Sequence, residues 1–246
     1  MMLTGKLATK SQHEIHEEPG VLTLGRTRGA AEQFRALVAR HVRTDITLDA
    51  SSYTQAYKKQ GYTGAYRAIF IIIDSPQAFD ESLELIENLR TADSSPIICA
   101  VITGRGTFNK IKYYLAGADY CIKFNTPPEE GSELLAEFFS SEEWQRDINL
   151  VLDPTRICLL GTRKKLDISF AEMKILEAFA QTSNHILSHD EIARIMGLNS
   201  NFYDPRALEK SISRLRGKIK DMYGTNAIQS IRGHGYRLMR GLISTA

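Results

Sequence analysis

Residues 210–238 read KSISRLRGKIKDMYGTNAIQSIRGHGYRL and combine an amphipathic helix with a compact hairpin. The helix is predicted by apolar residues that recur every three or four positions and so form one face. These residues are Leu208, Ile212, Leu215, Ile219 and Met222. The two β-rich runs that follow flank Gly233 and Gly235, which predicts two strands joined by a tight turn. A helix followed by such a hairpin is the layout of a winged-helix domain.

The opposite face of this helix is basic and polar, and could meet base edges and phosphates if the helix lay in a major groove. Its residues are Arg206, Lys210, Ser211, Ser213, Arg214, Lys218 and Lys220. A charged, solvated surface helix explains the periodicity equally well. The hairpin favours nucleic acid, because Arg232 lies near its tip beside His234, where an arginine can enter the narrower, more negative groove.

Signals upstream predict two further helices in the same domain. SFAE (169–172) and SHDE (188–191) have the spacing of a capping box, in which each side chain bonds an amide at a helix start. Gly197 then ends the second helix, and Asp204-Pro205 supplies an N-cap and a first-turn proline for the basic helix.

Charge is divided unevenly along the chain. Residues 151–246 hold 15 Lys and Arg against 9 Asp and Glu, so this part carries about +6 and the preceding part about −4. A basic part joined to an acidic part fits a nucleic-acid binder that carries a regulator, although charge alone indicates only a polyanionic partner.

Residues 150–242 resemble the DNA-binding domain of OmpR/PhoB-type response regulators. The segment 210–238 is close to that family's pattern hIsrLRkKl…I.TVrGxGYrl, and LDISFAEMKILEAF (166–179) corresponds to its first helix. The resemblance implies a winged helix-turn-helix fold, double-stranded DNA as a partner, and sequence-specific regulation of transcription.

The resemblance also implies roles for individual residues. It places three of them against bases or nearby phosphates of the major groove: Arg206, Ser213 and Arg214. Arg232 would reach the minor groove, Arg216 and Lys218 match basic positions that bind phosphates, and Tyr236 matches a structural aromatic residue. The segment 197–203 matches a loop that can contact RNA polymerase.

From Val21 to about Phe139, β-rich runs alternate with segments at helical spacing, as βα units around a parallel sheet do. The predicted strands cover residues 21–25, 45–50, 68–74, 96–103 and 119–124. The predicted helix faces carry Phe34, Leu37, Val38 and His41, then Leu85, Ile86 and Leu89, then Ile111, Tyr114 and Leu115. The run AIFIIID suits a strand buried on both faces, and its final Asp74 falls where the crevice of a doubly wound sheet lies.

This part resembles a receiver domain, which implies a five-stranded, flavodoxin-like α/β fold. Asp74 matches the phosphoacceptor, Thr103 the switch hydroxyl, and Lys123 the lysine that pairs with the phosphoryl group. GADYCIKF (117–124) is similar to the family's GADDYLvKPF. The resemblance further implies homodimers formed through the fourth helix, around residues 109–115, and the following strand.

The turn after the first strand departs from the receiver pattern. A receiver holds Mg²⁺ through acidic side chains there, whereas this chain offers Arg26, Thr27 and Arg28. Phe124 also replaces the proline that follows the lysine. We therefore expect no Mg²⁺ or other cofactor and a pseudo-receiver that acts without phosphorylation, with Arg26 pairing with Asp74 in place of a metal. A conventional regulator phosphorylated on Asp74 is the alternative.

The patterns predict a disordered leader over residues 1–19, a receiver-like domain over 20–140, a linker over 141–149 and a winged-helix domain over 150–243. No run approaches the roughly 18 apolar residues of a membrane span, and the leader lacks the apolar core of a signal peptide, so a cytoplasmic protein is expected. The cysteines lie singly in apolar runs and are expected to be reduced core residues. They are Cys99, Cys121 and Cys158.

Two functions of other classes remain open. An α/β enzyme could use Asp74, Thr103 and Lys123 as catalytic groups. That reading lacks a second acid and leaves the basic helix unexplained, so we expect no enzymatic activity. A protein-interaction module could instead dock another protein through the winged helix, and steep salt dependence of binding would distinguish DNA from such a partner.

Overall fold

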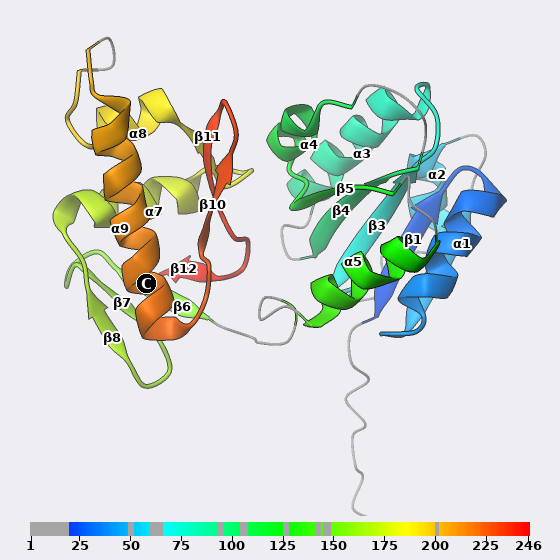
Figure 1. The fold of residues 1–246 in the computed structure, drawn as a ribbon, viewed down its shortest axis with the longest axis horizontal. Coiled ribbons are helices and arrows are strands. Elements are labelled where there is room, and N and C mark those ends of the chain that lie inside the picture. Colours follow the sequence, from blue (N-terminus) through cyan, green and yellow to red (C-terminus); the bar gives the residue numbers. More distant parts are fainter. Residues whose placement is uncertain are drawn as a thin grey trace, which may run out of the picture.

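The computed structural model describes residues 20–48, 52–59, 66–92, 96–103, 108–124, 128–140, 144, 149–199 and 202–246, which form two domains (Figure 1). The predicted leader over residues 1–19 and all of the predicted linker except residues 144 and 149 lie outside the described residues.

The N-terminal domain is a parallel sheet of five strands in the order β2-β1-β3-β4-β5. Its strands are β1 (Val21–Gly25), β2 (Thr44–Leu48), β3 (Ala68–Ile73), β4 (Ile97–Ile102) and β5 (Tyr120–Lys123). Its helices are α1 (Arg28–Val38), α2 (Tyr53–Lys59), α3 (Ala78–Ala92), α4 (Lys110–Ala116) and α5 (Pro128–Ser140). This is the strand order of the flavodoxin-like fold, so the predicted receiver-like architecture is confirmed.

Helices cover both faces of this sheet, which is why β3 is apolar at every position. On one face α2, α3 and α4 bury residues such as Tyr53, Leu85 and Tyr113 against the sheet. On the other face α1 and α5 bury residues such as Phe34 and Phe139. The carboxyl ends of all five strands therefore open onto one edge, between the helical layers.

Two predicted helix faces were wrong in detail. Helix α1 ends at Val38, so His41 lies beyond it, exposed, with its ring stacked 5.3 Å from that of Phe139. In α4 the buried residues are Tyr113 and Ala116, and Tyr114 of the predicted face is half-buried against the same core. Leu115 is exposed, and the Tyr114 ring also lies beside Arg237 of the second domain.

The C-terminal domain contains two small sheets and three helices. A four-stranded sheet has the order β12-β6-β7-β8, and a three-stranded sheet has the order β10-β11-β9. The strands are β6 (Leu150–Asp153), β7 (Cys158–Leu160), β8 (Lys165–Asp167), β9 (Ile186–Ser188), β10 (Ile228–Ile231), β11 (Gly235–Leu238) and β12 (Ile243–Thr245). The helices are α7 (Phe170–Gln181), α8 (His189–Ile195) and α9 (Pro205–Tyr223). The predicted winged helix is confirmed, while the pairing of β12 with β6 had no signal in the sequence.

The predicted helix boundaries of this domain are also confirmed. Ser169 and Ser188 begin α7 and α8 with complete capping boxes, and Asp204 caps α9 ahead of Pro205. The apolar stripe of α9 is buried in one core with residues of α7 and α8. Cys99, Cys121 and Cys158 are free and buried, as expected of core residues.

Candidate nucleic-acid interface

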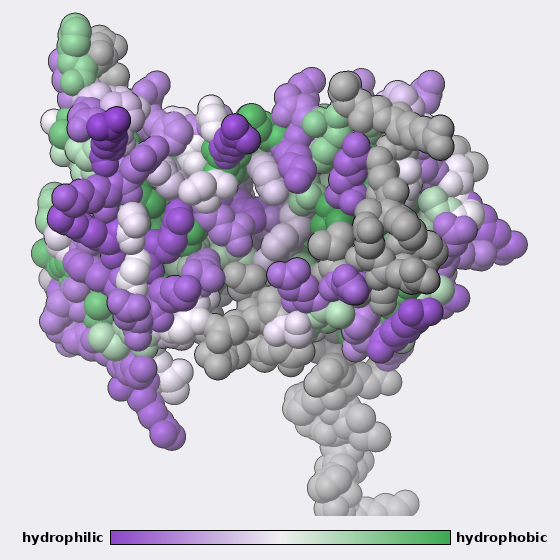
Figure 2. All heavy atoms as spheres, in the orientation of Figure 1, coloured by the Kyte–Doolittle hydropathy of each residue, from purple (hydrophilic) through white to green (hydrophobic). Residues whose placement is uncertain are grey.

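The predicted DNA-contacting face of α9 lies at the surface of the C-terminal domain. Six of its predicted residues are exposed: Arg206, Lys210, Ser213, Arg214, Lys218 and Lys220. Ser211 and Arg216 are half-buried. Figure 2 shows that hydrophilic side chains dominate the surface over the part of the molecule where Figure 1 places α9. The buried stripe holds the helix by its apolar side, so its cations point toward solvent.

Three residues of the predicted interface are bonded within the protein. Lys218 donates to both carboxylate oxygens of Glu172, at 2.9 and 2.8 Å, and so ties α9 to the first turn of α7. Arg216 donates to the Ser230 hydroxyl at 3.2 Å, and the Ser211 hydroxyl donates to a backbone carbonyl of its own helix. The phosphate roles predicted for Lys218 and Arg216 remain predictions, because both side chains already have partners.

The Glu172 contact had a partial signal in the sequence, since the capping box predicted its bond to the Ser169 amide but not its pair with Lys218. Burial raises the pKa of Glu172, but the hydrogen bonds from Lys218 and Ser169 outweigh it, so the pKa is held below its usual value. At neutral pH the carboxylate is therefore ionised and holds the Lys218 amine.

The hairpin of β10 and β11 forms the wing beside α9 (Figure 1). Arg232 is exposed at its turn, followed by Gly233 with a φ of 76°, a left-handed conformation that favours glycine. Gly235 crosses so close to the Leu187 carbonyl that a β-carbon would clash with it. His234 is half-buried, and its carbonyl accepts a hydrogen bond from the His189 amide. The wing thus presents Arg232 on a turn fixed by glycines.

The predicted switch residues of the N-terminal domain meet at the edge formed by the strand ends. Asp74 follows β3, Thr103 follows β4, and Lys123 ends β5 with its side chain exposed. The Thr103 amide donates to the Ile73 carbonyl at 2.9 Å, which joins the ends of β3 and β4. The structure therefore brings together the three groups that the receiver pattern predicts.

The turn after β1 carries Arg26, Thr27 and Arg28 at the positions where a receiver has acidic Mg²⁺ ligands. The Thr27 hydroxyl donates directly to a carboxylate oxygen of Asp74. Arg26 forms an ion pair with Glu81 at 3.2 Å, and Glu81 also accepts from the Tyr53 amide at 2.6 Å. The predicted pair between Arg26 and Asp74 stays a prediction. Within the described ranges, no three His, Cys, Asp or Glu side chains gather as a metal site would require.

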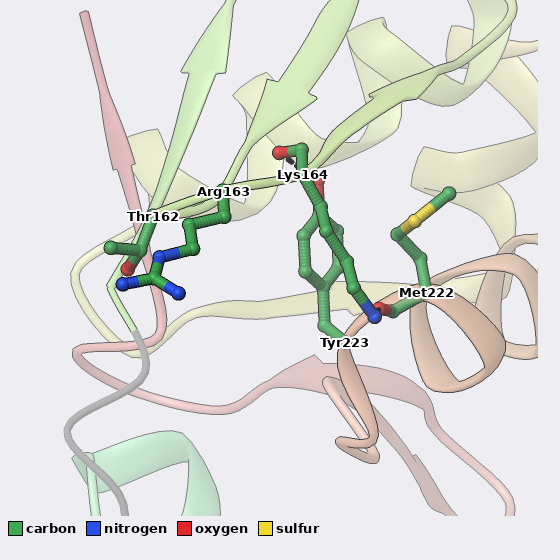
Figure 3. A pocket seen from close by; sticks show the side chains of 5 residues that line it. All are labelled: Thr162, Arg163, Lys164, Met222 and Tyr223. Atoms are coloured by element: carbon green, nitrogen blue, oxygen red, sulfur yellow. Dashed lines mark hydrogen bonds between the residues drawn. The ribbon is translucent and has the colours of Figure 1, made fainter.

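An open pocket lies at the C-terminal end of α9 (Figure 3). Thr162, Arg163 and Lys164, from the turn after β7, face Met222 and Tyr223 across it. Lys164 donates to the Met222 carbonyl at 2.8 Å, so the lysine satisfies a carbonyl at the helix end. The pocket is at the opposite end of α9 from Arg206. Its residues stabilise the C-terminal end of the helix.

Comparison with known proteins agrees with this geometry. Residues 163–238 match the family described as "Transcriptional regulatory protein, C terminal". The chain is 26% identical over 213 residues to the response regulator ArlR of Staphylococcus epidermidis, covering 81% of this chain and 93% of the relative. It is 27% identical over 204 residues to the transcriptional regulatory protein HprR of Escherichia coli, covering 77% and 88%.

Among solved structures, the response regulator DrrB of Thermotoga maritima is 15% identical, with a TM-score of 0.39 over 89% of this chain and 99% of that one. The DNA-binding domain of E. coli CadC is 27% identical, with a TM-score of 0.32 over 35% of this chain and 82% of that domain.

The exposed basic helix, its wing and the family match define a DNA-binding regulator of transcription. Its C-terminal domain is an OmpR/PhoB-type DNA-binding domain, and the chain as a whole is related to the response regulators. None of the helices in the described part of the chain is both long and apolar enough to span a membrane.

Proposed function

We propose that this protein is a cytoplasmic, non-enzymatic regulator that reads double-stranded DNA as a homodimer and does not need a phosphoryl group on Asp74. The observation that carries the proposal is the contrast between the exposed cations of α9 and the bonded strand-end residues of the N-terminal domain. Apart from Lys218, which is paired with Glu172, the exposed cations can accept a polyanion without breaking internal contacts, whereas a ligand at Asp74 would have to displace Thr27.

In the DNA complex, α9 would lie in the major groove. Arg206, Ser213 and Arg214 project from its exposed face and would meet base edges or adjacent phosphates. Lys210 would add a phosphate contact, and Arg232 would enter the minor groove beside the wing. Lys218 reaches DNA only by leaving Glu172, so it would contribute least.

Independence from phosphorylation rests on the residues around Asp74. A small divalent cation needs several oxygen ligands, and a receiver supplies them from acids after the first strand. Arg26, Thr27 and Arg28 provide cationic groups and one hydroxyl there, and that hydroxyl is bonded to Asp74. These residues do not fit a magnesium site, so the Mg²⁺ that supports phosphoryl transfer would have no adequate ligand set.

Two partner assignments belong to the same proposal. A homodimer would place two α9 helices on half-sites about one helical turn apart, roughly 10 bp. Phe202, in the α8–α9 loop predicted to contact RNA polymerase, is 87% exposed. A large aromatic side chain open to solvent is suited to a protein contact, so we assign this loop to the polymerase.

The test is a selection of genomic DNA fragments by the purified full chain, with and without a small phosphodonor plus Mg²⁺. We expect the same repeated motif to be enriched under both conditions. Enrichment only with the donor would mean that Asp74 is a working phosphoacceptor. No enriched motif, together with weak dependence of any partner binding on salt, would favour the protein-docking alternative.

A matched control rebuilds the missing acids in the double variant Arg26→Asp, Thr27→Asp. If the loss of these acids is what disables the pocket, the double variant should bind Mg²⁺ and incorporate phosphate from the donor, whereas the natural chain and the variant with Asp74→Asn added should not. Phosphate incorporation by the natural chain would contradict the proposal directly.

A further inference from the structure

The two domains contact each other through residues that the DNA-binding role does not use. The β9–β10–β11 sheet faces α4 and β5 of the N-terminal domain (Figure 1). Arg237 of β11 donates to the backbone carbonyls of Ala118 and Asp119, and its guanidinium lies 4.8 Å from the ring centre of Tyr114. Asn184 adds a hydrogen bond of 3.2 Å to the Leu115 carbonyl.

Asp119 is the charged centre of this contact. Its Oδ2 accepts from Arg90 within its own domain and from the Ile98 amide at 2.9 Å. Its Oδ1 accepts from Nε of Arg240, across the domain boundary, at 3.4 Å. The Arg240 side chain is only 6% exposed, so this pair is shielded from water and from salt.

His185 lies directly before β9, in the segment that meets this contact. Arg240 donates to the Ser183 carbonyl at 3.0 Å, and Asn184 bonds the N-terminal domain. The backbone of His185 has a φ of 56°, and its carbonyl accepts a hydrogen bond from the Leu238 amide. Among the described residues, Nδ1 of His185 has no hydrogen-bond partner, and neither has one terminal nitrogen of Arg240. The charged groups that act on the imidazole are Arg240, Asp119 and Arg90.

We propose that this contact is an acid-sensitive latch, in which protonation of His185 separates the DNA-binding domain from the receiver-like domain. A neutral imidazole fits beside two arginines and one carboxylate. An imidazolium there places a third cation against a single anion in a half-buried site. Opening the contact returns the ring to solvent and relieves that repulsion.

The direction of the pH dependence follows from linkage. Burial, and then Arg240, lower the pKa of His185 from 6.5 to about 4 in the closed form, while an exposed histidine keeps its ordinary value. The open form therefore binds a proton more tightly, so the closed form is fully favoured above about pH 6.5 and loses ground as the pH falls toward 4. Between pH 7.5 and 5.5 the ratio of open to closed molecules should rise about tenfold.

The proposed latch rests on the contacts between the two domains. It does not depend on how the protein binds DNA or on whether Asp74 is phosphorylated. It does bear on the proposed dimer, because α4 and β5 are the elements assigned to dimerisation and Arg237 occupies them in the closed form. Release of the latch would expose the face formed by α4 and β5 and would at the same time free the DNA-binding domain.

The experiment is single-molecule energy transfer in the full chain, with one dye on each domain, attached at cysteines placed at exposed Asn88 of α3 and exposed Asp221 of α9. The three natural cysteines are buried and should remain unlabelled. We expect the low-transfer fraction, relative to the high-transfer fraction, to rise about tenfold from pH 7.5 to 5.5. Equal ratios at the two pH values would overturn the proposal.

Three variants make the result specific. His185→Asn keeps a residue that tolerates positive φ but cannot become charged, and should abolish the rise. His189→Asn, four residues further on and packed edge-on against Tyr236, should retain it. Arg237→Ala should raise the low-transfer fraction at both pH values. A full tenfold rise in His185→Asn, with circular dichroism showing an intact fold, would rule out His185 as the sensor.

Discussion

In α9 the cations point into solvent from a helix that is anchored by its opposite face, whereas beside the strand ends of the N-terminal domain Asp74 and Arg26 are bonded to neighbouring residues. Arg214 and Lys210 are exposed, while Asp74 is bonded to Thr27 and Arg26 to Glu81. A surface that binds a ligand must leave its polar groups available, and the cations of α9 meet this condition better than Asp74 and Arg26 do.

The largest effect is expected at a buried charged group with a structural role, Arg90. Arg90→Met removes the cation that donates to Asp119 and to the carbonyls of Gly117 and Pro96. Asp119 keeps only Arg240 and the Ile98 amide, and the two carbonyls lose this donor, so the N-terminal domain should lose about 3 kcal/mol of stability. Urea unfolding monitored by circular dichroism measures this. A loss under about 1 kcal/mol would mean that the pair is exposed in solution.

A smaller effect is expected where the cation is available for a ligand. Arg214→Ala should weaken binding to the selected DNA motif by about 1 to 3 kcal/mol and relax one base preference, without changing stability. Fluorescence anisotropy on motif variants measures both. Lys174→Ala, an exposed cation on α7 that pairs with Glu177, is the matched control and should bind normally. Equal weakening on every sequence would reassign Arg214 to a phosphate contact.

Within α9, Lys218 differs from the unpaired cations, because its amine is exposed and also paired with Glu172. Lys218→Gln should reduce stability by about 0.2 to 1 kcal/mol, because pairs at the surface contribute little. Since the pKa of Glu172 is lowered, this contribution should be present above about pH 4.5 and vanish as the pH falls below it. Thermal unfolding at pH 7 and pH 3 tests this.

The salt dependence of DNA binding then separates the two lysines. Lys210→Gln should reduce the slope of log K against log salt by about 0.9, the value of one phosphate contact, while Lys218→Gln should change it little. A full unit lost in the second variant would show that Lys218 leaves Glu172 to bind phosphate.

The smallest effect is predicted at the strand ends. Asp74→Asn should leave affinity for the selected DNA motif unchanged, because Thr27 already bonds the carboxylate and the proposed regulator needs no phosphoryl group there. The amide can still accept from the Thr27 hydroxyl, so stability should fall by no more than about 1 kcal/mol. Affinity that falls in the variant, or that rises with a phosphodonor in the natural chain alone, would restore Asp74 as the switch.

By itself the sequence determined the elements whose signals are local. Capping residues, apolar periodicity and glycines fixed the helices of the winged domain, its wing and the βα alternation upstream, because each depends on neighbours within a few positions. The same patterns placed Asp74, Thr103 and Lys123 at strand ends. Where the helix was short or near its end, as in α4 and at His41, the periodic signal was too brief to assign the face.

Only the tertiary structure decided which charged side chains have partners within the protein and which are exposed. Lys218 and Glu172 are 46 positions apart, and Arg237 lies 118 positions from the Asp119 carbonyl that it bonds. Nothing local distinguishes Arg237 of the wing from Arg232 five positions earlier, yet Arg237 is buried against the other domain and Arg232 is exposed. Charges act through space, so the partner of each is set by chain packing and not by its sequence neighbours.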